Sequence, residues 1–385
     1  MRVLFTTVPL HGHFFPMVPL AHALRTAGHD VLVAAPVNFT GVITEAGLPA
    51  VPTAPPLNFA EIMIKDRNGR PVAPAKSAAE RHEIAGRAWG RLTARTLQRT
   101  LDVVDRWRPD IIVSEPSEHA GALAAASRGI PWIEHGWGIS TMPECRPPAA
   151  DELAAELSGL GLTALPEPDL HLHVCPPSMQ RPHAPGSRNQ RMRYVPYNGP
   201  ATLPDWSLAE RDRPRICLTF GSILPRFGSG DFRGLLTRIA TALPGLGTDL
   251  VVGVEEQIAA AWQPLPPGVR SAGWLPLSLV APSCDLIVHH GGSGSTLTAL
   301  AAGLPQLALP QTADQFDNAA CISVLGAGRQ LLDDVTVEAI LAACRELLTD
   351  PGYRKHAAAL AAENASQPTP AEVVEVLHEL TSTLV

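Results

Sequence analysis

Short apolar runs rich in β-branched residues alternate along the chain with longer Ala- and Leu-rich stretches of helical periodicity. This alternation is typical of βα units around a parallel sheet. Residues 16–28 illustrate it, because they predict a helix that begins at Pro16 and closes on Gly28. In the first half we expect strands at 2–8, 30–36, 110–114 and 131–137, and further helices at 75–107 and 119–129.

The same rhythm restarts after residues 194–214, a stretch with four prolines and no periodicity. Further strands are expected at 215–220, 249–255, 269–274, 285–290, 305–310 and 329–332, and helices fit between most of them. A chain of 385 residues exceeds one ordinary core. We therefore predict an α/β fold with Rossmann-like, doubly wound domains at 1–195 and 215–368, a linker at 196–214, and a C-terminal helix in 369–385 that can pack back on the first domain.

Two intervals of the first half, 52–74 and 138–190, are rich in proline and read as neither strand nor regular helix. Long insertions of this kind in a doubly wound domain are usually functional loops. We expect the N-terminal half to carry the variable part of recognition.

Composition narrows the class of protein. The formal charge is −7 and the basic residues are scattered, which argues against nucleic acid as a partner. The six cysteines lie far apart without a CxxC pair, so neither a zinc site nor a disulfide framework is expected. The N-terminal apolar run is too short for a signal peptide, and no run is long enough to span a membrane. We expect a cytoplasmic protein, and a homodimer is compatible with the sequence.

The stretch HHGGSGST, residues 289–296, lies between an expected strand and an expected helix. Unpaired N–H groups in the first turn of a helix favour an anion, and glycines let a phosphate approach the backbone. The alternative is a plain helix start with Ser295 as N-cap. The stretch lacks the lysine of a P-loop, and no GxGxxG follows the first strand, so a dinucleotide dehydrogenase is not favoured. A diphosphate is the expected ligand.

The segment 273–328, together with GHxxP near the N-terminus and TFGS at 219–222, resembles the family 1 nucleotide-sugar glycosyltransferases of the GT-B fold. The resemblance is to the actinobacterial enzymes that attach deoxysugars to antibiotics. It implies two domains facing a central cleft, with Trp274 and Leu275 against the nucleobase and Ser222 on the same side. It assigns the diphosphate to His290, Gly291, Gly292, Ser293, Gly294, Ser295 and Thr296, and the donor-sugar hydroxyls to Asp314 and Gln315. Asp314 could instead be only a helix cap.

His13 is expected in the loop between the first strand and the helix at Pro16, and it matches the family's GHxxP. A neutral imidazole is suited to taking the proton of an attacking hydroxyl, and a carboxylate can fix its tautomer. Glu115, at the end of a neighbouring strand, stands where the family usually shows Asp. Glu134 and His135 are alternative acceptor-site or auxiliary base residues. His171 and His173 lack a third ligand, so they read as loop or edge strand.

The acceptor is expected to contact apolar side chains of the first half, which suit a flat natural product such as a polyketide. The candidates are Phe14, Phe59, Met63, Trp89, Trp137 and Met142. The resemblance implies an inverting transferase that uses a TDP- or UDP-sugar, without metal or cofactor, and attacks through a hydroxyl or an aromatic carbon. The alternatives are a nucleotide-sugar 2-epimerase of the same fold and a catalytically silent nucleotide-sugar-binding protein.

Overall fold

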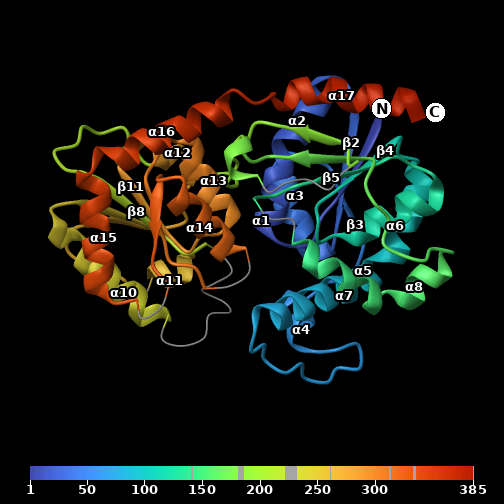
Figure 1. Cartoon of the computed structure of the whole chain (residues 1–385), viewed down its shortest axis with the longest axis horizontal. Helices are drawn as coiled ribbons and strands as arrows, with labels where there is room; N and C mark the ends of the chain where they lie inside the picture. The colour runs from blue at the N-terminus through green and yellow to red at the C-terminus, as the bar shows by residue number, and fades with distance from the viewer. Residues whose placement is uncertain are drawn as a thin grey trace. The chain divides into compact units, whose positions relative to one another are not determined.

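The computed structural model describes residues 1–139, 142–180, 186–221, 232–260, 262–311, 314–332 and 335–384. The chain divides into two compact units. Unit 1 comprises residues 1–175, 181–193 and 367–385, and unit 2 comprises 176–180 and 194–366. Each unit is an α/β layer structure with helices on both sides of a parallel sheet (Figure 1).

The sheet of unit 1 has the strand order β3-β2-β1-β4-β5-β6-β7, and every pair is parallel. The order reverses between β1 and β4, and in open α/β sheets the crevice at such a point is where ligands bind. The strands are β1 (Arg2–Thr6), β2 (Asp30–Ala35), β3 (Ala50–Pro52), β4 (Ile111–Ser114), β5 (Trp132–His135), β6 (Leu170–His173) and β7 (Asn189–Arg191).

The helices of unit 1 follow from local sequence signals. Ser77 caps α5 (Ala78–Trp107) by accepting from the Glu80 N–H, and Gly129 ends α6 (His119–Arg128) in the left-handed conformation. The other α-helices are α1 (His11–Phe14), α2 (Val18–Thr26), α3 (Thr40–Glu45), α4 (Phe59–Ile64), α7 (Arg146–Glu152), α8 (Ala154–Gly159) and α17 (Pro370–Leu384). As predicted for the C-terminal segment, α17 packs in unit 1, where it lies against α2 (Figure 1).

Unit 2 repeats the plan with the order β10-β9-β8-β11-β12-β13, again parallel throughout. Its strands are β8 (Arg215–Thr219), β9 (Asp249–Gly253), β10 (Val269–Gly273), β11 (Leu286–His289), β12 (Gln306–Ala308) and β13 (Gly328–Gln330). Its α-helices are α10 (Phe232–Ala242), α11 (Glu256–Ala260), α12 (Leu277–Val280), α13 (Ser293–Ala301), α14 (Gln315–Val324), α15 (Val337–Thr349) and α16 (Pro351–Ala365). The order reverses here between β8 and β11.

The interval 196–214, expected as a linker, belongs to unit 2. Trp206 packs against the core of that unit, and its carbonyl accepts a hydrogen bond from Arg215 at 3.3 Å. The guanidinium of Arg215 also lies over the Trp206 ring, 4.9 Å from its centroid. These contacts attach the segment to unit 2 despite its prolines.

The two intervals expected to lack regular structure contain several elements. Helix α4 lies in 52–74, and α7, α8, β6 and β7 lie in 138–190. Strand β6 alternates buried and half-buried positions over only four residues, which is too short a period to recognise in a sequence. Both histidines of β6 have a structural role, because His171 bonds Glu134 and His173 bonds Asn189. Tertiary pairing decided these strands, because β6 pairs with β5 and β7 pairs with β6.

Among the described residues, no helix combines the length and apolarity needed to cross a membrane. The same residues contain no group of three or more metal-ligating side chains placed to hold an ion.

Replacing Ile112 with Ala should lower the free energy of unfolding of unit 1 by about 2–5 kcal/mol, because a fully buried side chain of a central strand leaves a cavity. Ile64→Ala is the matched control, since that side chain is 60% exposed and its loss should cost under about 0.5 kcal/mol. Urea unfolding measures both. Equal losses would contradict the placement of β4 in the core.

Candidate functional site

The parallel register of β1 with β4 brings two predicted residues together. Thr6 is opposite Ser114, so the segments that follow these strands leave the sheet side by side. The His13 Nδ1 atom lies 2.9 Å from Glu115 Oε2. His13 lies in helix α1 and not in the loop that was predicted, because the chain turns helical directly after Leu10, whose carbonyl accepts from the His13 and Phe14 N–H groups.

Glu115 is completely buried and accepts four hydrogen bonds. Besides His13, the donors are the N–H groups of Val8 at 3.3 Å and Ser117 at 2.8 Å, and the indole of Trp137 at 3.1 Å. Burial alone raises the pKa of this carboxyl, but the nearby His13 and the backbone donors outweigh it, so the pKa lies below its ordinary value. Glu115 is therefore a carboxylate at neutral pH.

An ionised Glu115 can only accept a hydrogen bond, so the proton of a neutral His13 ring resides on Nδ1. The other nitrogen, Nε2, then carries the lone pair, and it has no partner within the part of the chain that the structure describes. The side chain of His13 keeps 14% of its surface exposed. This geometry leaves a base directed away from its carboxylate and reachable from outside.

Apolar side chains surround the ring of His13. Trp137 and Trp89 lie 5.1 and 5.5 Å from it, centroid to centroid. Phe59 of α4 stacks on Trp89 of α5 at 4.9 Å. The predicted acceptor residues Phe59, Met63, Trp89 and Met142, which belong to one apolar cluster, are called the apolar wall below.

Three other acceptor candidates lie elsewhere. Phe14 is 1% exposed and meets Phe39 edge-on at 5.9 Å, so it is a core residue. Glu134 bonds His171 at 3.0 Å. His135 is fully buried, donates from Nδ1 to the Gly136 carbonyl and has its pKa lowered to about 4 by burial. Both side chains are buried, which the sequence pattern of a strand end could not show, and an acceptor-site role for them stays a prediction.

The sequence analysis missed Glu118, which lies three residues after Glu115 and donates its N–H to the Glu115 carbonyl at 3.0 Å. It caps α6 by accepting from the Ala120 and Gly121 N–H groups, and it also accepts from the Thr6 hydroxyl at the end of β1. Burial raises its pKa to about 7, and the charge of Glu115 adds to the shift. Its position just before an Ala-rich helix was the available signal.

In unit 2 the glycine turn follows β11 at the point where the strand order reverses. Helix α13 begins at Ser293, two residues earlier than predicted, so Ser295 is not its N-cap. Within the described residues, the N–H groups of Ser293, Gly294 and Ser295 have no backbone acceptor, since the first bond of the helix runs from Thr296 to Gly292. Their partial positive charge is available to an anion.

The three glycines of the turn have different roles. A Cβ at Gly292 would lie 2.3 Å from the His290 ring, and one at Gly291, where φ is +86°, would lie 2.8 Å from the Gln315 carbonyl. These two are needed by the protein's own packing, whereas a Cβ at Gly294 would meet nothing within 4 Å. In addition, Gly291 donates its N–H to His289 Nδ1 at 3.0 Å. Gly291 thus has a packing role, and its predicted contact with a phosphate stays a prediction.

Buried polar atoms around this turn lack partners within the described residues. They are Nδ1 of His290, Oγ1 of Thr296 and Oδ1 of Asn318. Burial lowers the pKa of His290 to about 3, so its ring is neutral. Unsatisfied buried groups are rare in proteins, and a cluster of them at a helix N-terminus supports a ligand there.

Asn318 was missed, although it lies one helical turn after Asp314 in the sequence. Its amide donates to the Gly291 carbonyl at 2.7 Å, to Ser293 Oγ and to Asp314 Oδ2. The Ser293 hydroxyl also donates to Asp314, at 2.7 Å, so it is engaged within the protein, and its role as a diphosphate donor stays a prediction. Asp314 directly precedes α14, but its side chain makes no capping bond.

The remaining donor-site candidates divide between surface and core. Trp274 is 42% exposed, which leaves its ring accessible. Leu275 is 7% exposed and packs in the core of unit 2, so only its backbone could line a ligand. Gln315 is buried and accepts from the Gln311 N–H at 2.9 Å. Ser222 lies outside the described residues.

The chain matches a known protein family and curated relatives over nearly its whole length. Residues 22–221 and 237–380 match the N- and C-terminal domains of the family described as Erythromycin biosynthesis protein CIII-like. The L-demethylnoviosyl transferase of Streptomyces niveus is 43% identical, over 98% of this chain and 97% of that protein.

Solved structures show the same relationship. Glycosyltransferase SsfS6 of Streptomyces sp. SF2575, complexed with thymidine diphosphate, has a TM-score of 0.87 at 40% identity and covers 98% of this chain and 99% of its own. Spinosyn rhamnosyltransferase SpnG, also complexed with thymidine diphosphate, has a TM-score of 0.85 at 31% identity, over 98% and 100%.

Fold, site and relatives together define a glycosyltransferase of the GT-B fold, which confirms the predicted fold class and the prediction of a sugar-transferring enzyme. Within that class, the chain belongs to the Erythromycin biosynthesis protein CIII-like family.

Glu118 should make the free energy of unfolding depend on pH. Because its native pKa is about 7 against an ordinary 4.5, the native state holds a proton that the unfolded state has lost between these values. Stability should therefore fall as pH rises through this window, by about 3 kcal/mol. Glu118→Gln, which mimics the protonated acid, should remove this slope in urea unfolding, whereas Glu45→Gln at an exposed position should not. A variant that keeps the wild-type slope would refute the buried proton.

Proposed function

We propose that this enzyme transfers a sugar, of the deoxysugar type, from a TDP- or UDP-sugar to an apolar natural-product acceptor, with inversion at the anomeric carbon. The observation that carries the proposal is the His13–Glu115 pair at the switch point of unit 1. An imidazole with a bonded, ionised carboxylate on one nitrogen and an open second nitrogen is arranged for general base catalysis.

In the proposed step, Nε2 of His13 removes the proton of the acceptor hydroxyl while the oxygen attacks the anomeric carbon. The bond from that carbon to the diphosphate breaks, and its electron pair leaves with the diphosphate. Glu115 stabilises the resulting imidazolium, because it remains ionised and 2.9 Å from Nδ1. A positioned base of this kind contributes about 10²–10⁴ in rate. An aromatic carbon next to a phenol could attack in the same geometry once the phenol has lost its proton to His13. The bond to the diphosphate breaks as before, and the proton of the attacking carbon then moves to the phenol oxygen, which restores the aromatic ring.

The leaving diphosphate is assigned to the N-terminus of α13. The free N–H groups of Ser293, Gly294 and Ser295 and the unsatisfied Thr296 hydroxyl supply donors, and the helix dipole favours negative charge there. This electrostatic stabilisation is proposed to act without a metal ion or cofactor. Asp314 and Gln315, at the start of α14, are proposed to hold sugar hydroxyls.

The acceptor is assigned to the apolar wall beside His13. The flat stacked pair of Phe59 and Trp89 suits a ring system. The names of the relatives support this assignment, since they describe transferases of noviosyl and spinosyn chemistry and two of them bind thymidine diphosphate. A 2-epimerase would not need such a wall, and a silent binding protein would not need the His13–Glu115 pair.

The proposal includes a cytoplasmic location. It is supported by the six cysteines, all within the described residues, none of which forms a disulfide and five of which are buried. A homodimer is compatible with the proposal, although no step requires it.

Replacing His13 with Ala should lower kcat by about 10²–10⁴, because the acceptor hydroxyl loses its base. Calorimetric affinity for TDP should stay within about twofold, since unit 2 carries the diphosphate turn. His11→Ala is the matched control, because His11 packs against Phe15 and Phe39 and lies outside both the GHxxP motif and the His13–Glu115 pair. An H13A enzyme with more than about a tenth of wild-type kcat would contradict the assignment.

Titration with TDP, UDP and GDP in the absence of metal tests the diphosphate turn and identifies the nucleobase of the donor. Ser295→Ala combined with Thr296→Ala should weaken the best ligand by roughly tenfold or more, because two hydroxyl donors at the helix start are lost. Thr241→Ala, an exposed helical threonine of unit 2, is the control. Undiminished affinity in the double variant would place the diphosphate elsewhere.

A further inference from the structure

Helix α4 holds two members of the apolar wall, Phe59 and Met63, yet it has only six residues. Helices of this length are not stable by themselves in water, so tertiary contacts must hold it in place. On one side Ile62 is 1% exposed in the cluster around Trp89. Polar contacts add to this packing: Arg91 of α5 reaches the backbone of α4, and α7 reaches Arg67 in the turn that follows.

Arg91 of α5 provides the most direct polar contact. Its guanidinium is 3% exposed and donates twice to the carbonyl of Ile62, from Nε at 3.1 Å and from Nη2 at 2.9 Å. The Ile62 carbonyl belongs to the last turn of α4, where helices leave acceptors unsatisfied. Arg91 thus caps the helix between its two wall residues.

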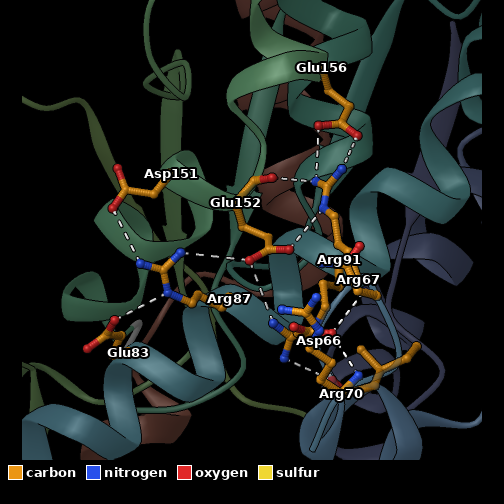
Figure 2. A network of polar contacts seen from close by, with 11 residues as sticks. Asp66, Arg67, Arg70, Glu83, Arg87, Arg91, Asp151, Glu152 and Glu156 are labelled. Carbon is orange, nitrogen blue, oxygen red and sulfur yellow. Dashed lines mark hydrogen bonds and ion pairs between the residues drawn. The ribbon is translucent and has the colours of Figure 1, made fainter. Parts of the chain in front are cut away.

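Glu152, at the end of α7, lies at the centre of a wider network (Figure 2). Its carboxylate faces three guanidinium groups: Arg67 at 2.9 Å, Arg91 at 3.7 Å and Arg87 at 3.8 Å. Glu156 adds a second carboxylate on Arg67, with contacts of 2.8 and 3.1 Å. Because Glu152 is 12% exposed and Arg91 3%, removing the carboxylate leaves a buried cation without its counter-charge.

Arg67 extends this attachment to the turn that follows α4. In that turn Val72 donates to the Ile64 carbonyl at 2.8 Å, and Asp66 to the Arg70 carbonyl at 2.9 Å. Asp66 also accepts from the Asn68 and Arg70 N–H groups. Helix α4 and its turn are therefore attached to the rest of unit 1 at two points. Arg91 binds Ile62, and Glu152 and Glu156 bind Arg67.

We infer that Arg91 and Glu152 are positioning residues that hold α4, and with it Phe59 and Met63, against Trp89, and so set the acceptor wall. They touch no reacting atom in this scheme and act through the backbone of α4. The inference rests on the proposed function for its effect on the acceptor, but the anchoring of α4 can be measured without it.

The test uses the full chain with Glu152→Gln, which keeps size and removes charge, and Arg91→Lys, which keeps charge and removes the two-pronged contact with Ile62. Glu83→Gln is the matched control, because Glu83 is 57% exposed and pairs only with Arg87 among the described residues. For both test variants the acceptor KM should rise by roughly tenfold, while kcat and the donor KM stay within about twofold. The control should change none of these.

Amide hydrogen exchange supplies the second readout. In both test variants, exchange in residues 59–72, including the Val72 and Asp66 amides, should accelerate by roughly tenfold, while amides of β1 and α6 stay protected. The inference would be overturned if residues 59–72 of the variants exchanged at the wild-type rate. A loss of kcat at unchanged acceptor KM would also overturn it. If the wild-type enzyme transferred sugar to no apolar acceptor, the proposed function would fail, and the exchange data would still decide whether the network anchors α4.

Discussion

The parallel pairing of β1 with β4 is the constraint on which the His13–Glu115 pair depends. It places Thr6 opposite Ser114, so that the chain enters α1 and the Glu115 turn from the same edge of the sheet. His13 and Glu115 lie 102 positions apart in the chain, so their contact depends on this tertiary pairing. Unit 2 applies the same rule, since the pairing of β8 with β11 places the glycine turn at its own reversal of strand order.

Burial makes both sites chemically distinct from solvent. Glu115 stays ionised in the interior because four donors point at it, whereas Glu118, three residues on, holds a proton to about pH 7. Two carboxylates with such different environments divide the work between stabilising a cation and joining β1 to α6. In unit 2, burial keeps His290 neutral, so positive potential at the turn comes from the backbone of α13.

The acceptor side is built differently. His13 and Glu115 are attached to strand ends, but Phe59 and Met63 belong to a short helix in a proline-rich segment. An apolar surface alone is non-directional and would leave the position of such a helix loosely defined. The guanidinium of Arg91 and the carboxylate of Glu152 add directional contacts that an apolar surface lacks. A helix held by directional polar contacts and the His13–Glu115 pair at the strand ends thus coexist in one unit.

The sequence by itself determined the two-unit α/β plan and the glycine turn, because these depend on local periodicity and on a motif with short spacing. The His13–Glu115 pair was expected from a family resemblance, and the pairing of β1 with β4 brings its two members together across 102 positions. The sequence could not place Phe14 in the core, bury His135, or reveal that Gly292 makes room for the His290 ring, because each depends on neighbours distant in the chain. Strands β6 and β7 and helix α4 were missed for the same reason. These short segments carry little signal. The pairing of β6 with β5 and of β7 with β6, and the capping of α4 by Arg91, decided their structure.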